Sequence, residues 1–142
     1  MLRQENLIHG KPGYEILVRI NWSWIKIPAA EILLIECAGN YLKIFTTTAK
    51  IPYLVRASLL QAEQLLCVDF FCRVHRSYLV GLNHIRYIDR DDVINLGVQN
   101  APLSKLYAQT LYSRFVRLGL GSVPAPMNVK QGSDNYRIRN NK

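Results

Sequence analysis

The segment FCRVHRSYLV, residues 71–80, combines strand-forming residues with a cluster of hydrogen-bonding side chains. The polar cluster consists of Arg73, His75, Arg76 and Ser77. Because alternate residues of a strand share a face, Arg76 would point inward together with Val74 and Tyr78. Arginine and histidine donate hydrogen bonds and can carry positive charge, which suits an anionic partner better than a packed interior. The segment therefore combines features of a core strand with features of a binding site.

Residue patterns typical of catalysis are missing from the sequence. It contains no HExxH pair, no glycine-rich phosphate loop and no carboxylate pair near a histidine. The histidines have no acidic or cysteine partner at metal-ligand spacing. The cysteines are odd in number and lack CxxC spacing, which predicts free thiols at Cys37, Cys67 and Cys72. We therefore expect the protein not to be an enzyme and to need no cofactor or metal.

The charge balance points to a polyanionic partner. Eighteen Lys and Arg against ten Asp and Glu give a formal net charge of +8 in 142 residues. Most of the positive excess lies after residue 100, whereas residues 57–100 are almost neutral. A basic balance of this kind favours nucleic acid as a partner, although it is also compatible with solubility alone.

The hydrophobic pattern predicts a β-rich domain with two short helices. Runs rich in β-branched and aromatic residues predict strands at 14–20, 22–27, 32–38, 40–48, 84–89 and 92–98. Ser58 and Gln61 form a capping-box pattern, so residues 58–67 are expected to be a short amphipathic helix. A second helix is predicted from Ser104 to about Leu118, before Gly119.

Composition divides the chain into three parts. Residues 1–13 end in the breaker cluster GKPG and are expected to be an exposed N-terminal lead-in. Residues 14–120 form the predicted domain, and residues 121–142 are expected to be a flexible basic tail. No apolar run reaches the roughly 20 residues of a membrane helix, and no secretory signal is evident. We therefore expect a cytoplasmic protein without a membrane partner.

Four segments, taken in this order, resemble the LytTR DNA-binding domain, a bacterial module: LLIECAGNYLKIFT, LVRASLLQAEQLL, FFCRVHRSYLVGLNHIRYI and APLSKLYAQTL. The likeness runs from about Tyr14 to Leu118. It implies a mainly β fold of elongated, small antiparallel sheets, in which inter-strand loops enter successive major grooves of double-stranded DNA. It also implies a sequence-specific transcription regulator that binds direct-repeat half-sites, with two copies side by side or as a homodimer. At this length we expect a stand-alone regulator without a receiver domain, controlled either by an unidentified regulatory partner or by its expression alone.

The resemblance also implies which residues contact DNA. The matching positions fall in three loops and comprise Asn40, Tyr41, Lys43, His75, Arg76, Ser77, Ser104 and Lys105. Arg56 and Arg73 are additional candidates for phosphate contacts. Chemically, an arginine can bond O6 and N7 of guanine, and a helix start such as Ser104 favours a phosphate oxygen.

Several of these residues have structural interpretations as well. His75 can bond a neighbouring carbonyl, and Tyr41 can simply pack on the sheet. Arg76 can pair with Asp69 or Glu63 instead of binding DNA. The corresponding alternative function is a LytTR-like protein-interaction module that has lost DNA binding.

The sequence departs from the family pattern at Gly81. Relatives commonly have Asn there. If that Asn braces the second loop in those proteins, this chain must brace its second loop through a different contact.

Overall fold

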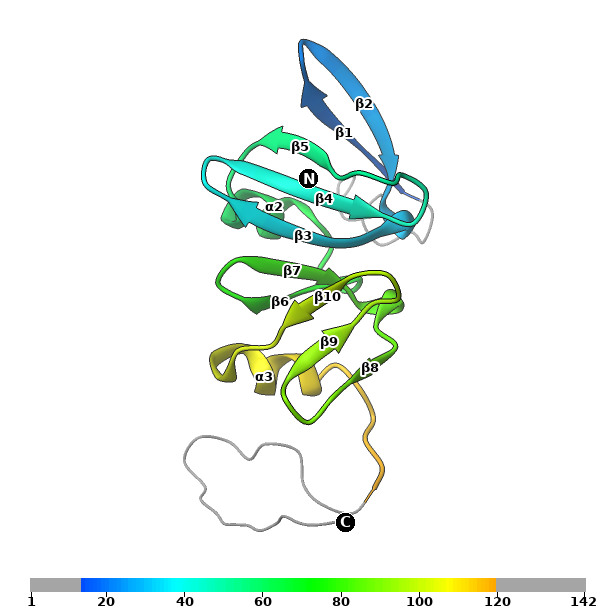
Figure 1. Cartoon of the computed structure of the whole chain (residues 1–142), viewed down its shortest axis with the longest axis vertical. Coiled ribbons are helices and arrows are strands. Elements are labelled where there is room, and N and C mark those ends of the chain that lie inside the picture. The colour runs from blue at the N-terminus through cyan, green and yellow to red at the C-terminus, as the bar shows by residue number, and fades with distance from the viewer. Residues whose placement is uncertain (1–13, 120–142) are drawn as a thin grey trace, which may run out of the picture.

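The computed structural model describes residues 14–119, which form an elongated stack of three antiparallel sheets (Figure 1). The predicted lead-in 1–13 and basic tail 121–142 lie outside the described residues. A two-stranded hairpin, β1 (Glu15–Ile20) and β2 (Ser23–Pro28), forms one end of the stack. At the other end lies a three-stranded sheet of order β10-β9-β8, made of β8 (Tyr87–Ile88), β9 (Val93–Asn95) and β10 (Asn100–Pro102).

A five-stranded sheet of order β5-β4-β3-β7-β6 occupies the centre of the stack. Its strands are β3 (Ile32–Ala38), β4 (Tyr41–Thr46), β5 (Tyr53–Arg56), β6 (Phe71–His75) and β7 (Tyr78–Gly81). Two short helices, α2 (Leu59–Leu65) and α3 (Lys105–Tyr112), accompany the sheets, together with the 3-10 turns η1 (Ala29–Glu31) and η2 (Leu82–His84). The expected mainly β fold with two short helices is therefore confirmed.

The central sheet is covered on both faces, which explains its continuous apolar sequences. On one face Ile35 and Leu79 pack with Leu59 of α2 and with residues of the β1–β2 hairpin. On the opposite face Leu34 and Val80 pack in a second cluster that includes residues of the three-stranded sheet and of α3. A strand that is buried on both faces reads as an unbroken apolar run, as ILLI does at the start of β3.

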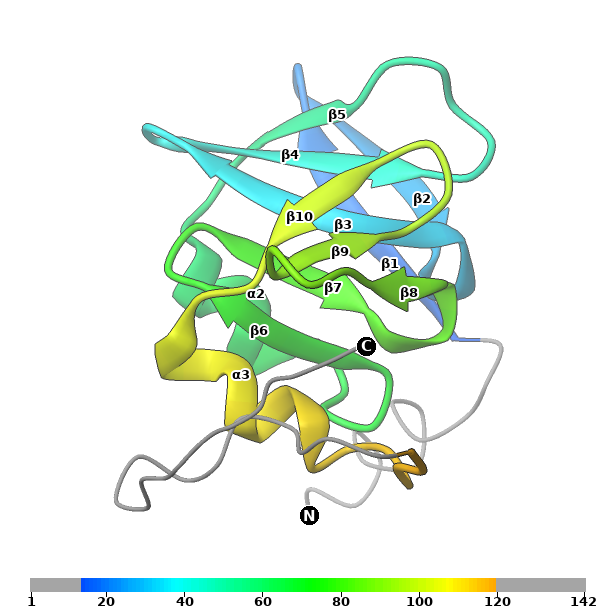
Figure 2. The same cartoon turned by 60° about the horizontal axis from the view of Figure 1, so that its bottom comes forward.

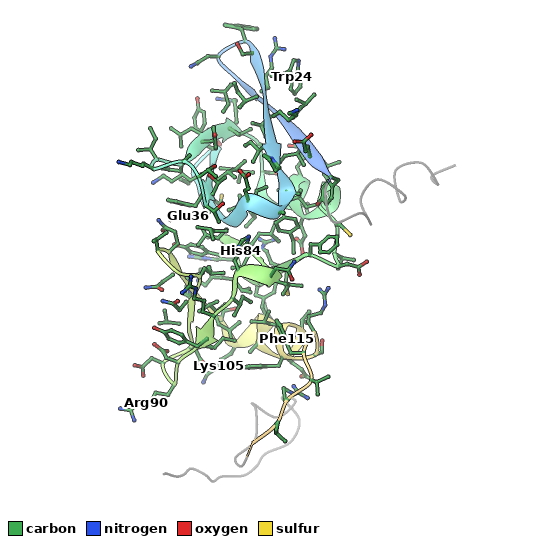
Figure 3. All side chains as sticks on the ribbon, turned by 90° about the vertical axis from the view of Figure 1, so that its right-hand side faces the viewer. Trp24, Glu36, His84, Arg90, Lys105 and Phe115 are labelled. Carbon is green, nitrogen blue, oxygen red and sulfur yellow. The ribbon has the colours of Figure 1, made fainter. Side chains whose placement is uncertain are left out.

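The β1–β2 hairpin carries an exposed aromatic surface at the end of the molecule. Its turn residues Asn21 and Trp22 both have positive φ angles, 49° and 70°. Such a backbone suits a two-residue hairpin turn, yet it is rare for a residue as bulky as tryptophan. The Arg19 guanidinium lies 5.7 Å from the Trp22 ring and 5.1 Å from the Trp24 ring. Figure 3 shows Trp24 near this end of the molecule and Arg90 toward the other.

The first helix begins as predicted, but it ends at Leu65 and not all of its leucines are buried. The Ser58 hydroxyl accepts a hydrogen bond from the Gln61 N–H at 3.0 Å, which confirms the capping interaction. Leu59 and Leu66 are buried, whereas Leu65 is exposed. Leu65 lies about a third of a turn away from Leu59 around the helix axis, so it faces solvent instead of the core.

The second helix is shorter than the sequence predicted. It ends at Tyr112, and Phe115 and Leu118 are exposed beyond it. The Ser113 hydroxyl donates a hydrogen bond to the Thr110 carbonyl, a bond that competes with continuation of the helix. The predicted extension to residue 118 is therefore wrong, because apolar residues at helical spacing do not find a core to pack against.

The strand predictions are also wrong in some other parts of the domain. Most of the predicted strand at 84–89 is a 3-10 turn and an extended connection, with only Tyr87 and Ile88 paired. Strands β5 and β10 were not predicted, since both are short and lie next to a proline or contain one. Within residues 14–119, no helix is both long and apolar enough to cross a membrane.

Candidate nucleic-acid interface

Three loops that carry the predicted site residues lie on the same side of the stack (Figures 1 and 2). They are the β3–β4 turn at 39–40, the β6–β7 turn at 76–77 and the start of α3 at 104–105. Two backbone hydrogen bonds join them: Cys37 N–H donates to the Ser77 carbonyl at 2.8 Å, and Ser104 N–H donates to the Val74 carbonyl at 2.9 Å. The fold therefore brings together residues that are more than 60 positions apart in the sequence.

The first loop is a tight hairpin turn that presents Asn40 and Tyr41. Gly39 provides the positive φ of 63° that the turn requires, and Asn40 is exposed. Tyr41 is 44% exposed and pairs across the strands with Arg56, whose guanidinium lies 6.0 Å from the tyrosine ring. The Arg56 side chain therefore lies beside the first loop. This contact could not be predicted, because it depends on β5.

Lys43 lies on the same face of β4 as Tyr41, but its side chain is less exposed to solvent than that of Tyr41. Its side chain is half-buried, and its strand register places it opposite Glu36 of β3. Glu36 also accepts a hydrogen bond of 3.1 Å from the Tyr78 hydroxyl across the β3–β7 pair. Burial raises the pKa of Tyr78, and the bond to Glu36 raises it further, so the hydroxyl remains a donor. This polar row links the first loop to the second.

The second loop leaves the core through a β-bulge. The register of β6 against β7 shifts between Arg73 and His75, which breaks the simple alternation. Arg76 therefore lies exposed in the turn instead of pointing inward with Val74 and Tyr78. Among the described residues, no carboxylate pairs with Arg76, so neither Asp69 nor Glu63 is its partner. Glu63 instead pairs with Arg73.

His75 contributes to the structure of this loop. Its Nδ1 atom accepts a hydrogen bond from the Ser77 N–H at 3.0 Å, in place of the expected bond to a carbonyl. Its ring also meets the Tyr78 ring edge-on, at a centroid distance of 5.5 Å. Because Nδ1 is an acceptor in this bond, the neutral ring carries its proton on Nε2. Nε2 therefore remains available as a hydrogen-bond donor.

The third loop joins the three-stranded sheet to α3. Ser104 precedes the helix, and among residues 14–119 its hydroxyl makes no capping bond. Lys105, the first helical residue, is exposed. Burial raises the pKa of the Asp92 carboxyl, the positive charge of Lys105 lowers it, and Asp89 and Asp91 raise it. Asp89, Asp91 and Asp92 form an acidic turn, and Lys105 lies close enough to this turn to interact with it electrostatically.

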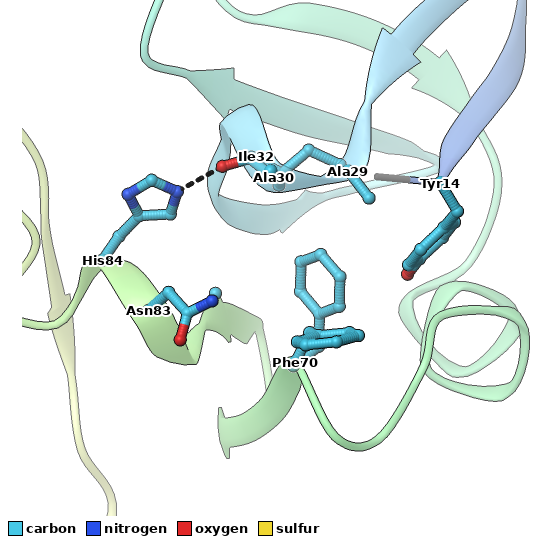
Figure 4. Close-up of a pocket in the computed structure, with 9 residues that line it drawn as sticks. Tyr14, Ala29, Ala30, Ile32, Phe70, Asn83 and His84 are labelled. Carbon is cyan, nitrogen blue, oxygen red and sulfur yellow. Dashed lines mark hydrogen bonds between the residues drawn. The ribbon is translucent and has the colours of Figure 1, made fainter. Parts of the chain in front are cut away.

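A separate cavity lies near the start of β3 and the end of β7, at the ends of these strands that are away from the first and second loops (Figure 4). Its volume is about 160 Å³, and its lining includes Tyr14, Ile32, Phe70 and Asn83. His84 also lines it, with Nε2 2.6 Å from the Ala30 carbonyl oxygen. Ile32 begins β3, whereas the first loop follows its end, so the cavity is separate from the three loops.

Arg73, a candidate for a phosphate contact, faces the protein instead of its surface. Its guanidinium pairs with Glu63 at 2.6 Å, and its side chain is only 16% exposed. This ion pair could not be predicted from the sequence, because Glu63 belongs to α2 and Arg73 to β6.

The fold defines a class of mainly β domains built of small antiparallel sheets, and comparisons with known proteins identify the family. Residues 23–115 match the family described as the LytTr DNA-binding domain. The protein therefore belongs to the LytTR DNA-binding domain family, a family without catalytic activity, which implies DNA binding in transcriptional regulation. The predicted resemblance is confirmed, and so is the expectation that the protein is not an enzyme.

Among solved structures, the chain is similar to the LytTr DNA-binding domain of a Bacillus cereus protein that is described as a methyl-accepting/DNA response regulator. The two share 24% sequence identity and a TM-score of 0.60, over 74% of this chain and 97% of the other. This likeness supports the fold. No curated protein matches the chain.

Proposed function

We propose that the protein is a sequence-specific, double-stranded DNA-binding transcription regulator that inserts its three loops into successive major grooves. The observation that supports this proposal most strongly is the exposure of Arg76 at the tip of the second loop, without a carboxylate partner among residues 14–119. A guanidinium that protrudes in this way is free to bond O6 and N7 of a guanine. Such a regulator works where bacterial DNA lies, in the cytoplasm.

The other loop residues have complementary roles in this proposal. Asn40 offers the amide that can bond N6 and N7 of adenine, and the Nε2 donor of His75 can reach a base or a phosphate. Ser77 lies next to Arg76 in the turn. Tyr41, Lys43 and Arg56 line the first loop, where cations suit the DNA backbone.

The third loop is suited to a phosphate. The Ser104 hydroxyl makes no capping bond at the start of α3 within the described residues, and Lys105 adds a positive charge beside it. A lysine lacks the planar fork of arginine, so this loop should contribute more to affinity than to base selectivity.

Selection of bound duplexes from a random pool, at near-physiological salt, tests the proposed function. We expect one recurrent sequence, arranged as direct repeats that are occupied by two copies of the protein. Affinity for the selected duplex should fall with salt at a log–log slope of about −0.9 per neutralised phosphate. Equal affinity for the selected duplex and a scrambled one would refute sequence-specific binding.

The acidic turn beside Lys105 provides a second test. Asp92→Asn is expected to raise the affinity for any duplex roughly two- to fivefold, because it removes a negative charge near Lys105. Asparagine tolerates the positive φ of 61° at this position. Fluorescence anisotropy with a labelled duplex at low salt measures the change. Asp69→Asn is the control, because Asp69 is an exposed acid that lies next to Phe70 of the separate cavity, away from Lys105. An equal gain in affinity from Asp69→Asn would show that only net charge matters.

A further inference from the structure

The Arg73 guanidinium spans three parts of the fold. Its Nε donates to the His75 carbonyl at 2.9 Å, and its Nη2 donates to the Arg76 carbonyl at 2.6 Å. Its Nη1 donates to Glu63 of α2 at 2.6 Å. Its carbon centre also lies 5.7 Å from the ring of Tyr107 on α3. All three nitrogens of the side chain thus have acceptors within the protein.

These contacts leave little of Arg73 for DNA. An arginine that binds a phosphate presents its donors outward, as the exposed Arg76 can do, whereas Arg73 directs its donors toward the loop backbone and α2. Two of its acceptors are carbonyls of the residues that the proposed function assigns to base or phosphate recognition. Arg73 is therefore placed to control how His75 and Arg76 are presented.

We propose that Arg73 is a positioning residue that holds the second loop in its DNA-reading conformation and ties it to the third loop through Tyr107. This inference rests on the proposed function. With both carbonyls drawn toward the guanidinium and the Ser77 N–H bonded to His75, the loop is ordered before DNA arrives. Preorganisation of this kind reduces the entropy that binding would otherwise lose.

The arrangement requires arginine and not merely a positive charge. Arginine presents five N–H donors in one rigid plane, which matches two carbonyls and a carboxylate at once. Lysine has a single ammonium on a flexible stem, so it cannot bond these separate acceptors in the same geometry. Arg73→Lys therefore separates the role of geometry from the role of charge.

Amide hydrogen exchange in the DNA-free protein tests the inference independently of any DNA. In Arg73→Lys, the Ser77 N–H should exchange at least about tenfold faster, since charged hydrogen bonds that hold the loop are lost. The Thr47 N–H, bonded to the Glu31 carbonyl at the other end of the sheet, should keep its wild-type rate. An unchanged rate at Ser77 would overturn the positioning role whether or not the protein binds DNA.

Binding measurements distinguish positioning from a phosphate contact. In Arg73→Lys, the preference for the selected duplex over a scrambled one should fall about tenfold or more, the order of one lost base contact. The salt dependence and the affinity for scrambled DNA should stay as in the wild type. If Arg73 instead bound a phosphate, lysine would keep most of the binding and the sequence preference would not change.

Glu63→Gln is a second variant, which avoids any change at the guanidinium itself. The Glu63 side chain is 40% exposed on α2, so this change should leave the fold intact. Electrostatics alone predicts tighter binding to every duplex when this carboxylate is removed. Positioning predicts a weaker preference for the selected duplex and faster Ser77 exchange. Tighter binding with an unchanged preference would contradict the inference.

Discussion

Arg76→Ala combined with Lys105→Ala is expected to lower the affinity for the selected duplex by about 100-fold or more. The arginine accounts for about 1–3 kcal/mol of base discrimination, and the lysine adds a phosphate contact. The salt slope should become shallower by about one phosphate equivalent. Titration of wild type and variant at several salt concentrations measures both quantities. Both side chains are exposed, so thermal stability should change little.

The matched control removes two positive charges from a different part of the surface. Lys50 is exposed in the connection that follows β4, at the opposite end of that strand from Tyr41. Arg86 is also exposed and lies in a surface pocket with Thr47 and His84. Lys50→Ala with Arg86→Ala should therefore weaken binding only slightly. If the Arg76/Lys105 variant bound as tightly as the wild type, the protein-interaction alternative would be favoured.

Gly81→Asn is expected to destabilise the fold by about 1–3 kcal/mol, although the family resemblance would suggest an asparagine at this position. A Cβ atom added to Gly81 would lie 2.5 Å from the Ile32 carbonyl oxygen and 3.3 Å from the His84 ring. The carbonyl belongs to the backbone of the central sheet, so it can yield only if β3 moves.

Thermal unfolding measures this effect, and the midpoint should fall by about 4–8 °C for each kcal/mol lost. Gly39→Asn is the matched control, because its added Cβ would meet nothing within 4 Å and asparagine tolerates its φ of 63°. A midpoint unchanged in Gly81→Asn would mean that this part of the sheet adapts without cost. Gly81 ends β7 on the side away from the 76–77 turn, so an Asn there would not brace the second loop as the sequence suggested.

The parts of the fold that follow from local patterns could be predicted from the sequence. The strand at 32–38 and the capping of α2 by Ser58 are local features, and both were found as expected. The end of α3 was not, because helical spacing cannot reveal that Phe115 lacks a core to pack against. Strand β5 could not be predicted for a similar reason, because this short segment is recognised as a strand mainly by its pairing with β4.

The candidate site shows the same division between local and distant information. Sequence motifs placed Asn40, Arg76 and Lys105 in loops, and the structure brings these loops to one side of the molecule. The roles of Arg73 and Glu63 depend on contacts between β6 and α2, which no spacing rule encodes. Partners of arginine must be found in three dimensions, because a long side chain can reach across elements.

The exposed hairpin turn determines what intrinsic fluorescence can report. The only two tryptophans of the chain, Trp22 and Trp24, are 88% and 59% exposed on the β1–β2 hairpin. Their indole emission should resemble that of water-exposed indole even in the native protein, so denaturation will change it little. Quenching on addition of a ligand would then indicate contact at this hairpin, whereas a ligand confined to the three loops should leave the emission spectrum unaltered.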